Sequence, residues 1–322
     1  MNEHFIAWWN VENLFDERDA PLERRSESVR RKIIADLQNW TAAVLEQKIT
    51  NLASIIRLMN DGNGPDILGV CEVENRFVLE QLMNHITIAG RNYDLIHHDM
   101  SDNRGIDVAF IYDANKYTFL ENEFFNHTVI KRYPTREIIQ ATLRIRDSER
   151  ELILLGNHWP SRTKGQYETE PYRIITAETL SYFVERIQQV KGDDAAILAM
   201  GDFNDEPTNR SLTDYALSVR DIETVRRGRK PYLYNMMWPI IGQRRASYVY
   251  DNNPIMLDQI LIAKGIANDD SPFIVDDENV RLEEYEGMVA GHYHEPVRFG
   301  QRNPNLEGYS DHLPISFVLR EE

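Results

Sequence analysis

Polar residues suited to phosphate chemistry follow one apolar run of this sequence after another. The run Phe5–Trp9 ends in Asn10, and Ile67–Cys71 ends in Glu72. Further runs lead to, or start from, His158, Asp202, Asn204, Asp258, Asp311 and His312. Active sites of sheet proteins gather at strand ends, so this repeated coincidence carries more weight than any single position.

A phosphoester resists attack because its oxygens already carry negative charge. A catalyst must neutralise that charge, activate water and stabilise the leaving oxygen. Oxygen ligands such as Glu72 and Asn10 suit Mg²⁺, which is a hard cation, and the lack of a Cys or dense His set argues against zinc. Each residue alone has a plainer interpretation, since Asn10 could cap a turn and a lone histidine is more often structural.

The elements that must position these residues are short apolar runs alternating with amphipathic stretches. Helical spacing predicts helices over Val44–Met59, Phe77–Ile86 and Ile174–Ile187. In Ile139–Arg146 apolar and polar residues alternate, which predicts a strand with one solvent-facing side. The predicted strands are Phe5–Trp9, Asp66–Cys71, Val108–Tyr112, Ile139–Arg146, Leu152–Leu155, Ala195–Met200, Leu257–Ile262 and Ile315–Leu319.

These strands cluster in hairpin-like groups between helices, which favours an α/β sandwich. No domain boundary is evident, so we expect a single catalytic domain over residues 1–322. The charge-rich segment Glu12–Asn39 and the polar segment Asp269–Gly308 are predicted to be surface excursions, either plain loops or lids.

Seven motifs in order resemble the endonuclease/exonuclease/phosphatase superfamily, in particular its bacterial nuclease-like branch. They are Trp9-Asn10-Val11-Glu12-Asn13-Leu14-Phe15, Asp66-Ile67-Leu68-Gly69-Val70-Cys71-Glu72-Val73, Arg104-Gly105-Ile106-Asp107-Val108-Ala109, Asn157-His158-Trp159-Pro160-Ser161-Arg162, Gly201-Asp202-Phe203-Asn204, Leu257-Asp258-Gln259-Ile260 and Ser310-Asp311-His312-Leu313-Pro314. The resemblance implies a four-layer α/β sandwich, with two packed mixed β-sheets flanked by helices. It also implies a metal-dependent phosphoesterase that uses Mg²⁺, for which Mn²⁺ can substitute.

The resemblance implies the following roles. Glu72 and Asn10 are the expected metal ligands, with Asp311 as a further candidate. Asp202 is the candidate general base or the anchor that orients the attacking water, and Asn204 is expected to donate to a phosphate oxygen or to the developing transition state. The carboxylate of Asp258 would hold His312 in its protonated form, and His158 would stabilise phosphoryl oxygens or assist the leaving group. Arg104 and Asp107 would touch substrate or orient His158, and Arg162 would clamp phosphate.

Composition limits the class of substrate without fixing it. The chain has 322 residues, with 36 Lys plus Arg against 52 Asp plus Glu, and a formal charge of −16. An acidic surface repels phosphate backbones at long range, although a bound cation reverses the local field. The single cysteine, Cys71, is predicted to be a buried small hydrophobe. The pair His97-His98 falls outside every motif.

Two substrate classes stay open. The leading hypothesis is an endonuclease or phosphodiesterase acting on DNA or RNA. The aromatics Trp8, Trp9, Trp159 and Tyr167 could stack on bases, but core packing explains them as well. The alternative is a phosphatase or phosphodiesterase of a small molecule or lipid headgroup. A non-catalytic binding module is disfavoured because Glu72, Asp202 and His312 are all present.

The location of the protein is predicted only from what the sequence lacks. No secretory signal pattern or long apolar run is present, so we expect a cytoplasmic protein without stable membrane attachment, although a trimmed secreted form would look the same. No protein partner can be inferred.

Overall fold

Two large mixed sheets form the centre of the molecule in a computed structural model, which describes residues 1–102, 104–130, 135–243 and 245–322. The first sheet has the order β15 (Phe273–Val275), β19 (Ile315–Glu321), β1 (Asn2–Leu14), β2 (Ile67–Val73), β4 (Asp107–Asp113) and β3 (Tyr93–His97), with β16 (Arg281–Leu282) also on β19. The second has the order β10 (Ser218–Val219), β11 (Leu233–Asn235), β14 (Asp258–Ile262), β9 (Ile197–Asp202), β8 (Glu151–His158), β7 (Ile138–Ile145) and β5 (Tyr117–Phe119), with β6 (Phe125–His127) also on β7. Two separate hairpins are β12 (Tyr248–Tyr250) with β13 (Asn253–Ile255), and β17 (Val289–Ala290) with β18 (Glu295–Pro296).

Strand alternation divides the core into layers. In β1, Ile6 and Trp8 pack between the two sheets, whereas Ala7 and Trp9 pack on the opposite side against helices. This period of two is what a strand imposes when both of its faces are covered. The predicted strand Phe5–Trp9 is thus the middle of a longer buried strand.

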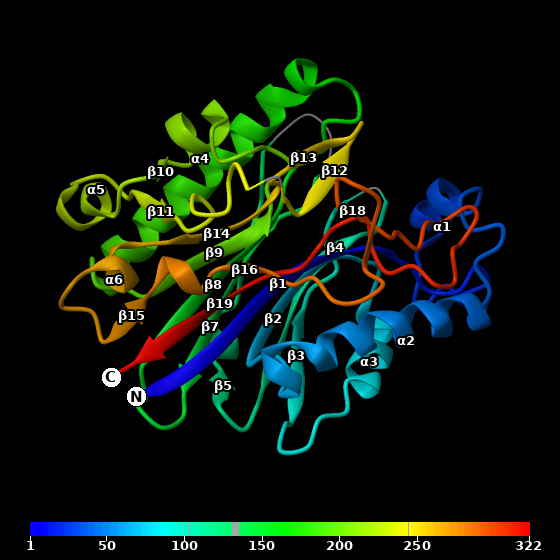
Figure 1. Cartoon of the computed structure of the whole chain (residues 1–322), viewed down its shortest axis with the longest axis horizontal. Coiled ribbons are helices and arrows are strands. Elements are labelled where there is room, and N and C mark those ends of the chain that lie inside the picture. The colour runs from blue at the N-terminus through cyan, green and yellow to red at the C-terminus, as the bar shows by residue number, and fades with distance from the viewer. Residues whose placement is uncertain (103, 131–134, 244) are drawn as a thin grey trace.

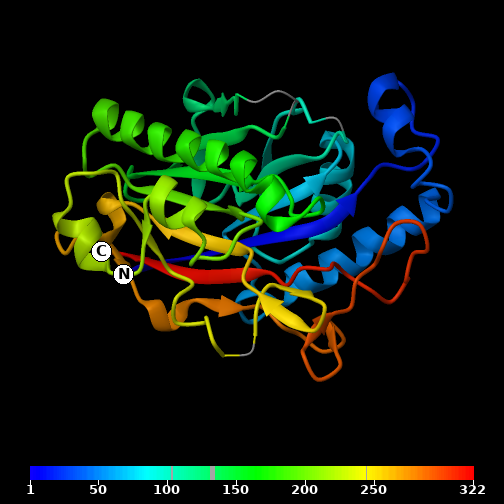
Figure 2. The ribbon, with the colours of Figure 1, turned by 90° about the horizontal axis from the view of Figure 1, so that it is seen from above.

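Helices cover both outer faces, as Figures 1 and 2 show. The first sheet is covered by α2 (Ala42–Leu58) and α3 (Arg76–His85), whose apolar residues share a cluster with the outward residues of β1 and β2. The second is covered by α4 (Gln166–Lys191). The smaller helices are α1 (Glu27–Ile33), α5 (Ile222–Arg227) and α6 (Lys264–Ala267). The arrangement is the predicted four-layer sandwich.

The capping of α2 and α3 explains why these helices begin where they do. Thr41 accepts a hydrogen bond from the Val44 N–H at 3.3 Å, and Asn75 accepts one from Val78 at 3.1 Å. Each cap satisfies one of the free N–H groups of a helix N-terminus. The chain leaves the helical conformation shortly after α2, where Asp61 and Gly62 adopt positive φ angles of 53° and 86°.

Two expectations about exposed surfaces are wrong. Gln140 and Thr142 in β7 are buried, because α4 lies over that face: Gln140 hydrogen-bonds His127, which stacks on Phe183 of α4 at 3.6 Å. The segment Glu12–Asn39 is not merely a surface excursion. Its Arg25 side chain is fully buried against Glu74, and polar partners for such a group arise only in the folded chain.

Strand direction brings the predicted site residues to one edge of the sandwich. β1 runs parallel to β2, and β8 parallel to β9, so the carboxyl ends of the two strands in each pair lie side by side. β19 is antiparallel to β1 and β14 is antiparallel to β9, so their first residues meet those same ends. Figure 1 shows both termini at the opposite end of the molecule from α1, β12 and β18.

The longest helix, α4, carries charged and polar residues along its length. Among the described residues, none of the helices combines the length and apolar character needed to cross a membrane.

Candidate active site

Side chains from both sheets converge at this shared edge. His158 Nε2 lies 3.7 Å from Glu72 Oε1 and 3.7 Å from Asp202 Oδ2. His312 Nε2 lies 4.0 Å from the same Asp202 oxygen, and Asn10 Nδ2 donates to it at 3.1 Å. Residues separated by up to 302 positions in the sequence therefore surround a single point.

Glu72 reaches the site because its strand is irregular there. Its φ is 64°, and the pairing of β2 with β4 shifts register between Cys71 and Val73. A bulge of this kind re-aims one side chain and is costly for a residue with a Cβ. Glu72 Oε2 accepts the Asn13 N–H at 2.9 Å, while Oε1 faces His158 beyond hydrogen-bonding distance. One carboxylate oxygen is thus held while the other faces into the site.

Asp202 is held by amide donors on both of its oxygens. Asn204 has a φ of 50°, which lets its backbone N–H reach Asp202 Oδ1 at 2.9 Å. The Asn204 amide also donates to Asp202 Oδ2 at 3.1 Å and to the Trp159 carbonyl at 3.0 Å. The side-chain donors of Asn204 that were predicted to contact phosphate are engaged within the protein, so in this structure Asn204 orients Asp202.

Burial raises the pKa of Asp202 to about 6, although the nearby His312 opposes the shift. A general base must be deprotonated, so activity is expected to be lost as pH falls through the pKa of Asp202. We expect log kcat/KM to rise with a slope of about one on the acid side and to level off toward neutral pH, and bound Mg²⁺ would move the midpoint below the value for the metal-free site. A pH–rate profile checks this, and activity that stays constant to the lowest pH at which the protein is folded would exclude Asp202 as the base.

His312 and Asp258 form a buried ion pair, with 2.6 Å between Nδ1 and Oδ2. Burial alone would lower the pKa of His312, but the charges of Asp258, Asp202 and Asp311 raise it well above its ordinary value. The imidazolium is therefore the stable form at neutral pH, with Nε2 directed toward Asp202. Tyr248 packs against the His312 ring, with 4.8 Å between centroids.

His158 has the opposite character. Burial, together with the charges of Arg136, Arg104 and His312, lowers its pKa well below the ordinary value. Its Nδ1 is buried and has no hydrogen-bond partner within the described ranges. The site thus combines a charged imidazole at residue 312 with a neutral one at residue 158.

The structure places the other predicted residues differently. Arg104 is exposed and donates to Asn13 Oδ1, beside Glu72. Asp107 does not reach His158, because its carboxylate bonds His97 Nε2 at 2.9 Å and the Met100 N–H at 3.0 Å. A role for Asp107 in orienting His158 therefore does not fit this geometry.

Arg162 is engaged with other protein groups. Its Nε donates to the Asn204 carbonyl at 2.7 Å, and its Nη2 donates to Asp205 and Asn209, both at 2.9 Å. A guanidinium used in this way fixes the loop after β9, and the phosphate contact expected of Arg162 stays a prediction.

Asp311 lies in an acidic part of the site. Burial and the charge of Glu12 raise its pKa to about 7, with His312 and Arg298 opposing. Arg298 Nη2 lies 3.5 Å from Asp311 and 2.6 Å from Glu12. Glu12 was not singled out from the sequence, although it stands in the first motif. It anchors the segment around residue 298 to the end of β1.

Several residues that support the site could not be identified from sequence. Trp8 Nε1 donates to Asp258 Oδ1 at 3.1 Å, and Trp9 Nε1 donates to the His312 carbonyl at 2.8 Å. Arg136 donates to the backbone carbonyls of His158 and Trp159 at 3.1 and 2.9 Å. Because Trp8, Trp9 and Trp159 are fully buried, they cannot stack on bases.

Lys48 of α2 also supports the site and could not be identified from the sequence. Its side chain is fully buried. Its ammonium donates to the Tyr309 carbonyl at 3.3 Å. Burial lowers its pKa to about 8, although the charges of Glu12, Asp311 and Glu72 oppose this. A cation behind three carboxylates offsets part of their mutual repulsion.

Trp8→Phe is expected to lower the free energy of unfolding by about 1.5–3 kcal/mol, because the variant loses a donor to the buried Asp258 carboxylate. Urea denaturation measures this. Trp40→Phe is the matched control, since Trp40 Nε1 donates to the Phe15 carbonyl at 2.9 Å, outside the catalytic cluster. Both variants should lose stability, but only Trp8→Phe should lower kcat. Equal kcat values in the two variants would contradict the role of Trp8 in positioning Asp258.

The donor set fits a hard divalent cation. Glu72 has one oxygen directed into the site, and Asn10 adds an amide oxygen that also accepts the Glu12 N–H at 3.0 Å. Carboxylate and amide oxygens near further carboxylates are the ligands that Mg²⁺ prefers. The raised pKa values of Asp202 and Asp311 show negative charge that a cation would stabilise.

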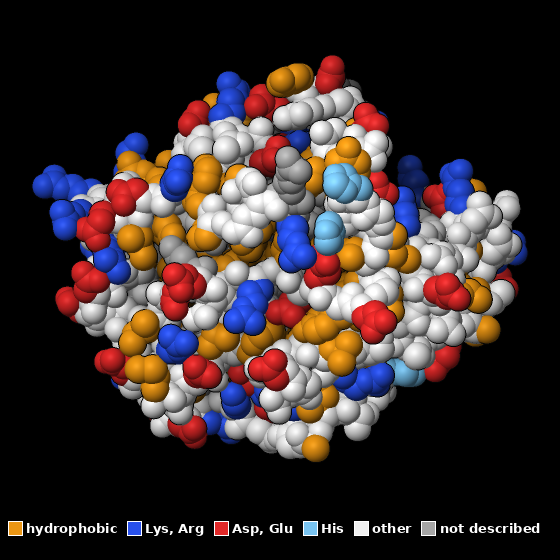
Figure 3. All heavy atoms as spheres, viewed as in Figure 1, with side chains coloured by type: hydrophobic (Ala, Val, Ile, Leu, Met, Phe, Trp, Pro, Cys, Tyr) orange, Lys and Arg blue, Asp and Glu red, His pale blue; other side chains and the backbone are white. Residues whose placement is uncertain are grey.

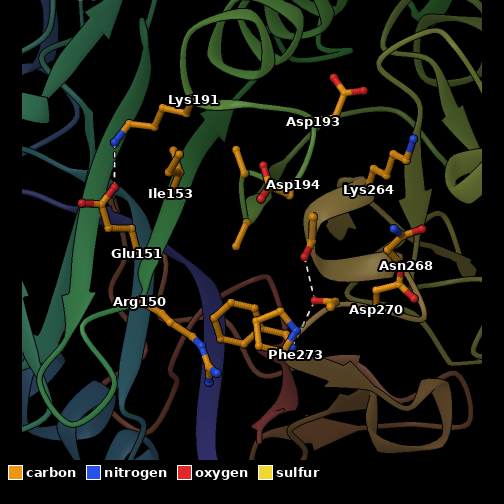
Figure 4. Close-up of a pocket in the computed structure, with 15 residues that line it drawn as sticks. Arg150, Glu151, Ile153, Lys191, Asp193, Asp194, Lys264, Asn268, Asp270 and Phe273 are labelled. Carbon is orange, nitrogen blue, oxygen red and sulfur yellow. Dashed lines mark hydrogen bonds and ion pairs between the residues drawn. The ribbon is translucent and has the colours of Figure 1, made fainter.

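A hollow of about 660 Å³ lies far from this cluster. Figure 4 shows it lined by Glu151, Lys191, Lys264 and Phe273, at the starts of β8 and β9 and the end of β14. The Lys191 ammonium is held there by Glu151 at 2.7 Å and Glu123 at 2.6 Å. The candidate site residues lie at the opposite ends of the same strands.

Comparisons with known proteins agree with this geometry. Residues 5–321 match the Endonuclease/Exonuclease/phosphatase family, whereas no curated protein matches the chain. The fold is similar to that of the human Nocturnin catalytic domain, with a TM-score of 0.54, 15% identity, and coverage of 99% of this chain and 95% of that one. It is also similar to truncated TDP2 from Caenorhabditis elegans, with a TM-score of 0.57, 14% identity, and coverage of 98% of this chain and 97% of that one. A mannosyl-6-phosphatase from Bacteroides thetaiotaomicron has a similar fold as well, with a TM-score of 0.53, 16% identity, and coverage of 98% of this chain and 99% of that one.

Proposed function

We propose, because this chain belongs to the endonuclease/exonuclease/phosphatase family, that it is a Mg²⁺-dependent phosphoester hydrolase whose first candidate substrate is a nucleic-acid phosphodiester. Members of this family hydrolyse phosphoester bonds and are in general metal-dependent. The observation that carries the proposal is that the side chains of Glu72, Asp202, His158 and His312 meet at one sheet edge. His158 Nε2 lies 3.7 Å from both Glu72 and Asp202, and His312 Nε2 lies 4.0 Å from Asp202.

Each residue has a defined task in this proposal. Asp202, oriented by Asn204 and Asn10, accepts a proton from the attacking water. The His312 imidazolium, held by Asp258, donates to a phosphoryl oxygen and stabilises the charge that develops there. His158 is neutral, so its Nε2 can donate a hydrogen bond without adding charge. Glu72 and Asn10 would hold Mg²⁺, which would further neutralise the phosphoryl oxygens.

Hydrolysis of bis-p-nitrophenyl phosphate tests the proposal. We expect turnover with Mg²⁺ or Mn²⁺, and loss of turnover after EDTA that is restored when the cation is added back. Activity that survives complete chelation would overturn metal dependence. Absence of turnover on this diester and on p-nitrophenyl phosphate, with a folded protein and saturating Mg²⁺, would overturn the hydrolase itself.

A small phosphorylated molecule is the second candidate, and surface charge favours it. Figure 3 shows acidic and basic side chains interspersed over one face, and the chain carries a formal charge of −16. Proteins that hold long phosphate backbones gain affinity from clustered cations. Two assays run side by side distinguish the nucleic-acid substrate from the small-molecule substrate. One measures nicking of supercoiled plasmid, and the other measures release of phosphate from a panel of sugar phosphates. Plasmid nicking that weakens with added salt supports the first candidate.

A further inference from the structure

We propose that His97, Asp99 and Asp107 form a second metal site, selective for Zn²⁺ over Mg²⁺, at the base of the loop over residues 98–106. One ligand atom from each of the three lies within 4.8 Å of the others. This site is separate from the proposed catalytic one, and nothing in the proposed hydrolysis uses these residues.

Sheet register explains why the three side chains meet. His97 ends β3 and is paired with Ala109 of β4, so Asp107, two residues before Ala109, lies on the same face. Asp99 follows His97 by two residues. The arrangement therefore follows from the antiparallel pairing of β3 and β4.

The distances suit a tetrahedral cation. His97 Nε2 lies 2.9 Å from Asp107 Oδ2 and 3.9 Å from Asp99 Oδ1. Zn²⁺ binds imidazole nitrogen and carboxylate oxygen at about 2.0–2.2 Å, which places neighbouring tetrahedral ligand atoms about 3.3–3.5 Å apart. The observed separations lie on both sides of that value. Asp99, with a side chain 84% exposed, has the freedom to close the longer one.

The surroundings favour a cation over a simple hydrogen-bonded pair. The side chains of Asp107 and His97 are almost completely buried, with 2% and 3% exposed. A divalent cation would neutralise both carboxylates. The Met100 N–H already fixes Asp107 Oδ1, leaving Oδ2 directed at His97. Such support of a ligand by a backbone donor is characteristic of metal sites.

Access and selectivity follow from the same residues. The Asp99 side chain is 84% exposed, so the site is open to solvent on that side. The imidazole makes the site poor for Mg²⁺, which demands oxygen ligands in octahedral geometry, and suitable for Zn²⁺.

The position of the site gives it a structural role in the loop. The segment between Asp99 and Asp107 carries Asp102, which pairs with Arg136 at 3.1 Å, and Arg104, which bonds Asn13. Arg136 in turn holds the backbone carbonyl of His158. A metal joining both ends of this loop would fix residues that contact the catalytic cluster.

Equilibrium dialysis against Zn²⁺ in excess Mg²⁺, with bound zinc measured by elemental analysis, tests the proposal. We expect one Zn²⁺ bound per chain, with affinity at least about tenfold weaker in Asp99→Ala and His97→Gln. His98→Ala is the matched control, because His98 is adjacent and exposed and packs on Phe124 outside the three-residue cluster. Asp99→Ala changes only an exposed side chain, so the test does not depend on whether His97→Gln folds.

Co²⁺ provides a second readout, since tetrahedral Co²⁺ bound at this site should give visible absorption that disappears in Asp99→Ala. The proposal is overturned if the wild-type protein binds no Zn²⁺, or if Asp99→Ala binds Zn²⁺ as tightly as the wild type. It is also overturned if Zn²⁺ binding is lost in Glu72→Gln and kept in Asp99→Ala, because the ion would then belong to the catalytic cluster. None of these results depends on turnover.

Discussion

His312→Gln is expected to lower kcat by about 10²–10⁴-fold while leaving the protein folded. His312 is the one imidazole of the cluster whose pKa is raised, and its charge is sustained by the pair with Asp258. Gln can still donate to Asp258 but cannot carry the positive charge. The loss should therefore appear in kcat with the diester substrate more than in stability.

The control for this prediction is His85→Ala. His85 lies at the end of α3 and pairs with Glu46, away from the catalytic cluster. Its removal should leave kcat within about twofold of the wild type, as is usual for a surface change. Comparable turnover in His312→Gln and His85→Ala would show that the charged imidazole does not take part in catalysis.

Glu72→Gln is the second large effect. The variant can keep an oxygen for the Asn13 N–H but loses the negative charge that faces the site. We expect kcat/KM to fall by about 10²–10³-fold and the Mg²⁺ concentration for half-maximal activity to rise at least about tenfold. Titration of activity with Mg²⁺ measures both quantities.

Glu80→Gln is the matched control for Glu72→Gln, because Glu80 is a half-exposed carboxylate on α3 that pairs with Arg76. It should leave the Mg²⁺ titration unchanged. An unchanged titration in Glu72→Gln as well would remove Glu72 from the metal site, even if activity fell for another reason.

Most of the layer architecture could be predicted because apolar periodicity reports burial directly. The helix predicted over Val44–Met59 corresponds to α2, and the strand predicted over Asp66–Cys71 corresponds to β2. The prediction of a solvent-facing side failed for Gln140 and Thr142, because a polar residue that is buried under a helix looks the same in sequence as one in water. The burial of Arg25 was missed for the same reason.

The meeting of the candidate site residues could be predicted because active sites of sheet proteins gather at strand ends, and the structure adds the strand directions that bring those ends to one edge. Partners could not be assigned, because they come from distant parts of the chain. Arg162 is bound to the loop after β9, and Asp107 to His97, although both stand in motifs. Trp8 looked like an apolar core residue, and only its indole N–H contact with Asp258 shows its second role.

Of the two histidines, only the charge of His312 could be predicted from the sequence. The pairing of Asp258 with His312 was expected from the motifs, and it accounts for the raised pKa of that histidine. Nothing in Asn157-His158-Trp159 indicates that burial and two arginines would lower the pKa of His158. Environment sets these properties, so they follow from packing and not from residue type.

Crystals soaked with Mn²⁺ and a non-hydrolysable phosphorothioate diester would provide the most direct test through their anomalous scattering. The predicted result is a manganese peak within coordination distance of Glu72 Oε1, with the phosphoryl group between that ion and the imidazole of His312. A site of full occupancy elsewhere, with neither ion nor phosphoryl group at the cluster, would contradict the proposal that these residues form a metal-dependent phosphoesterase site.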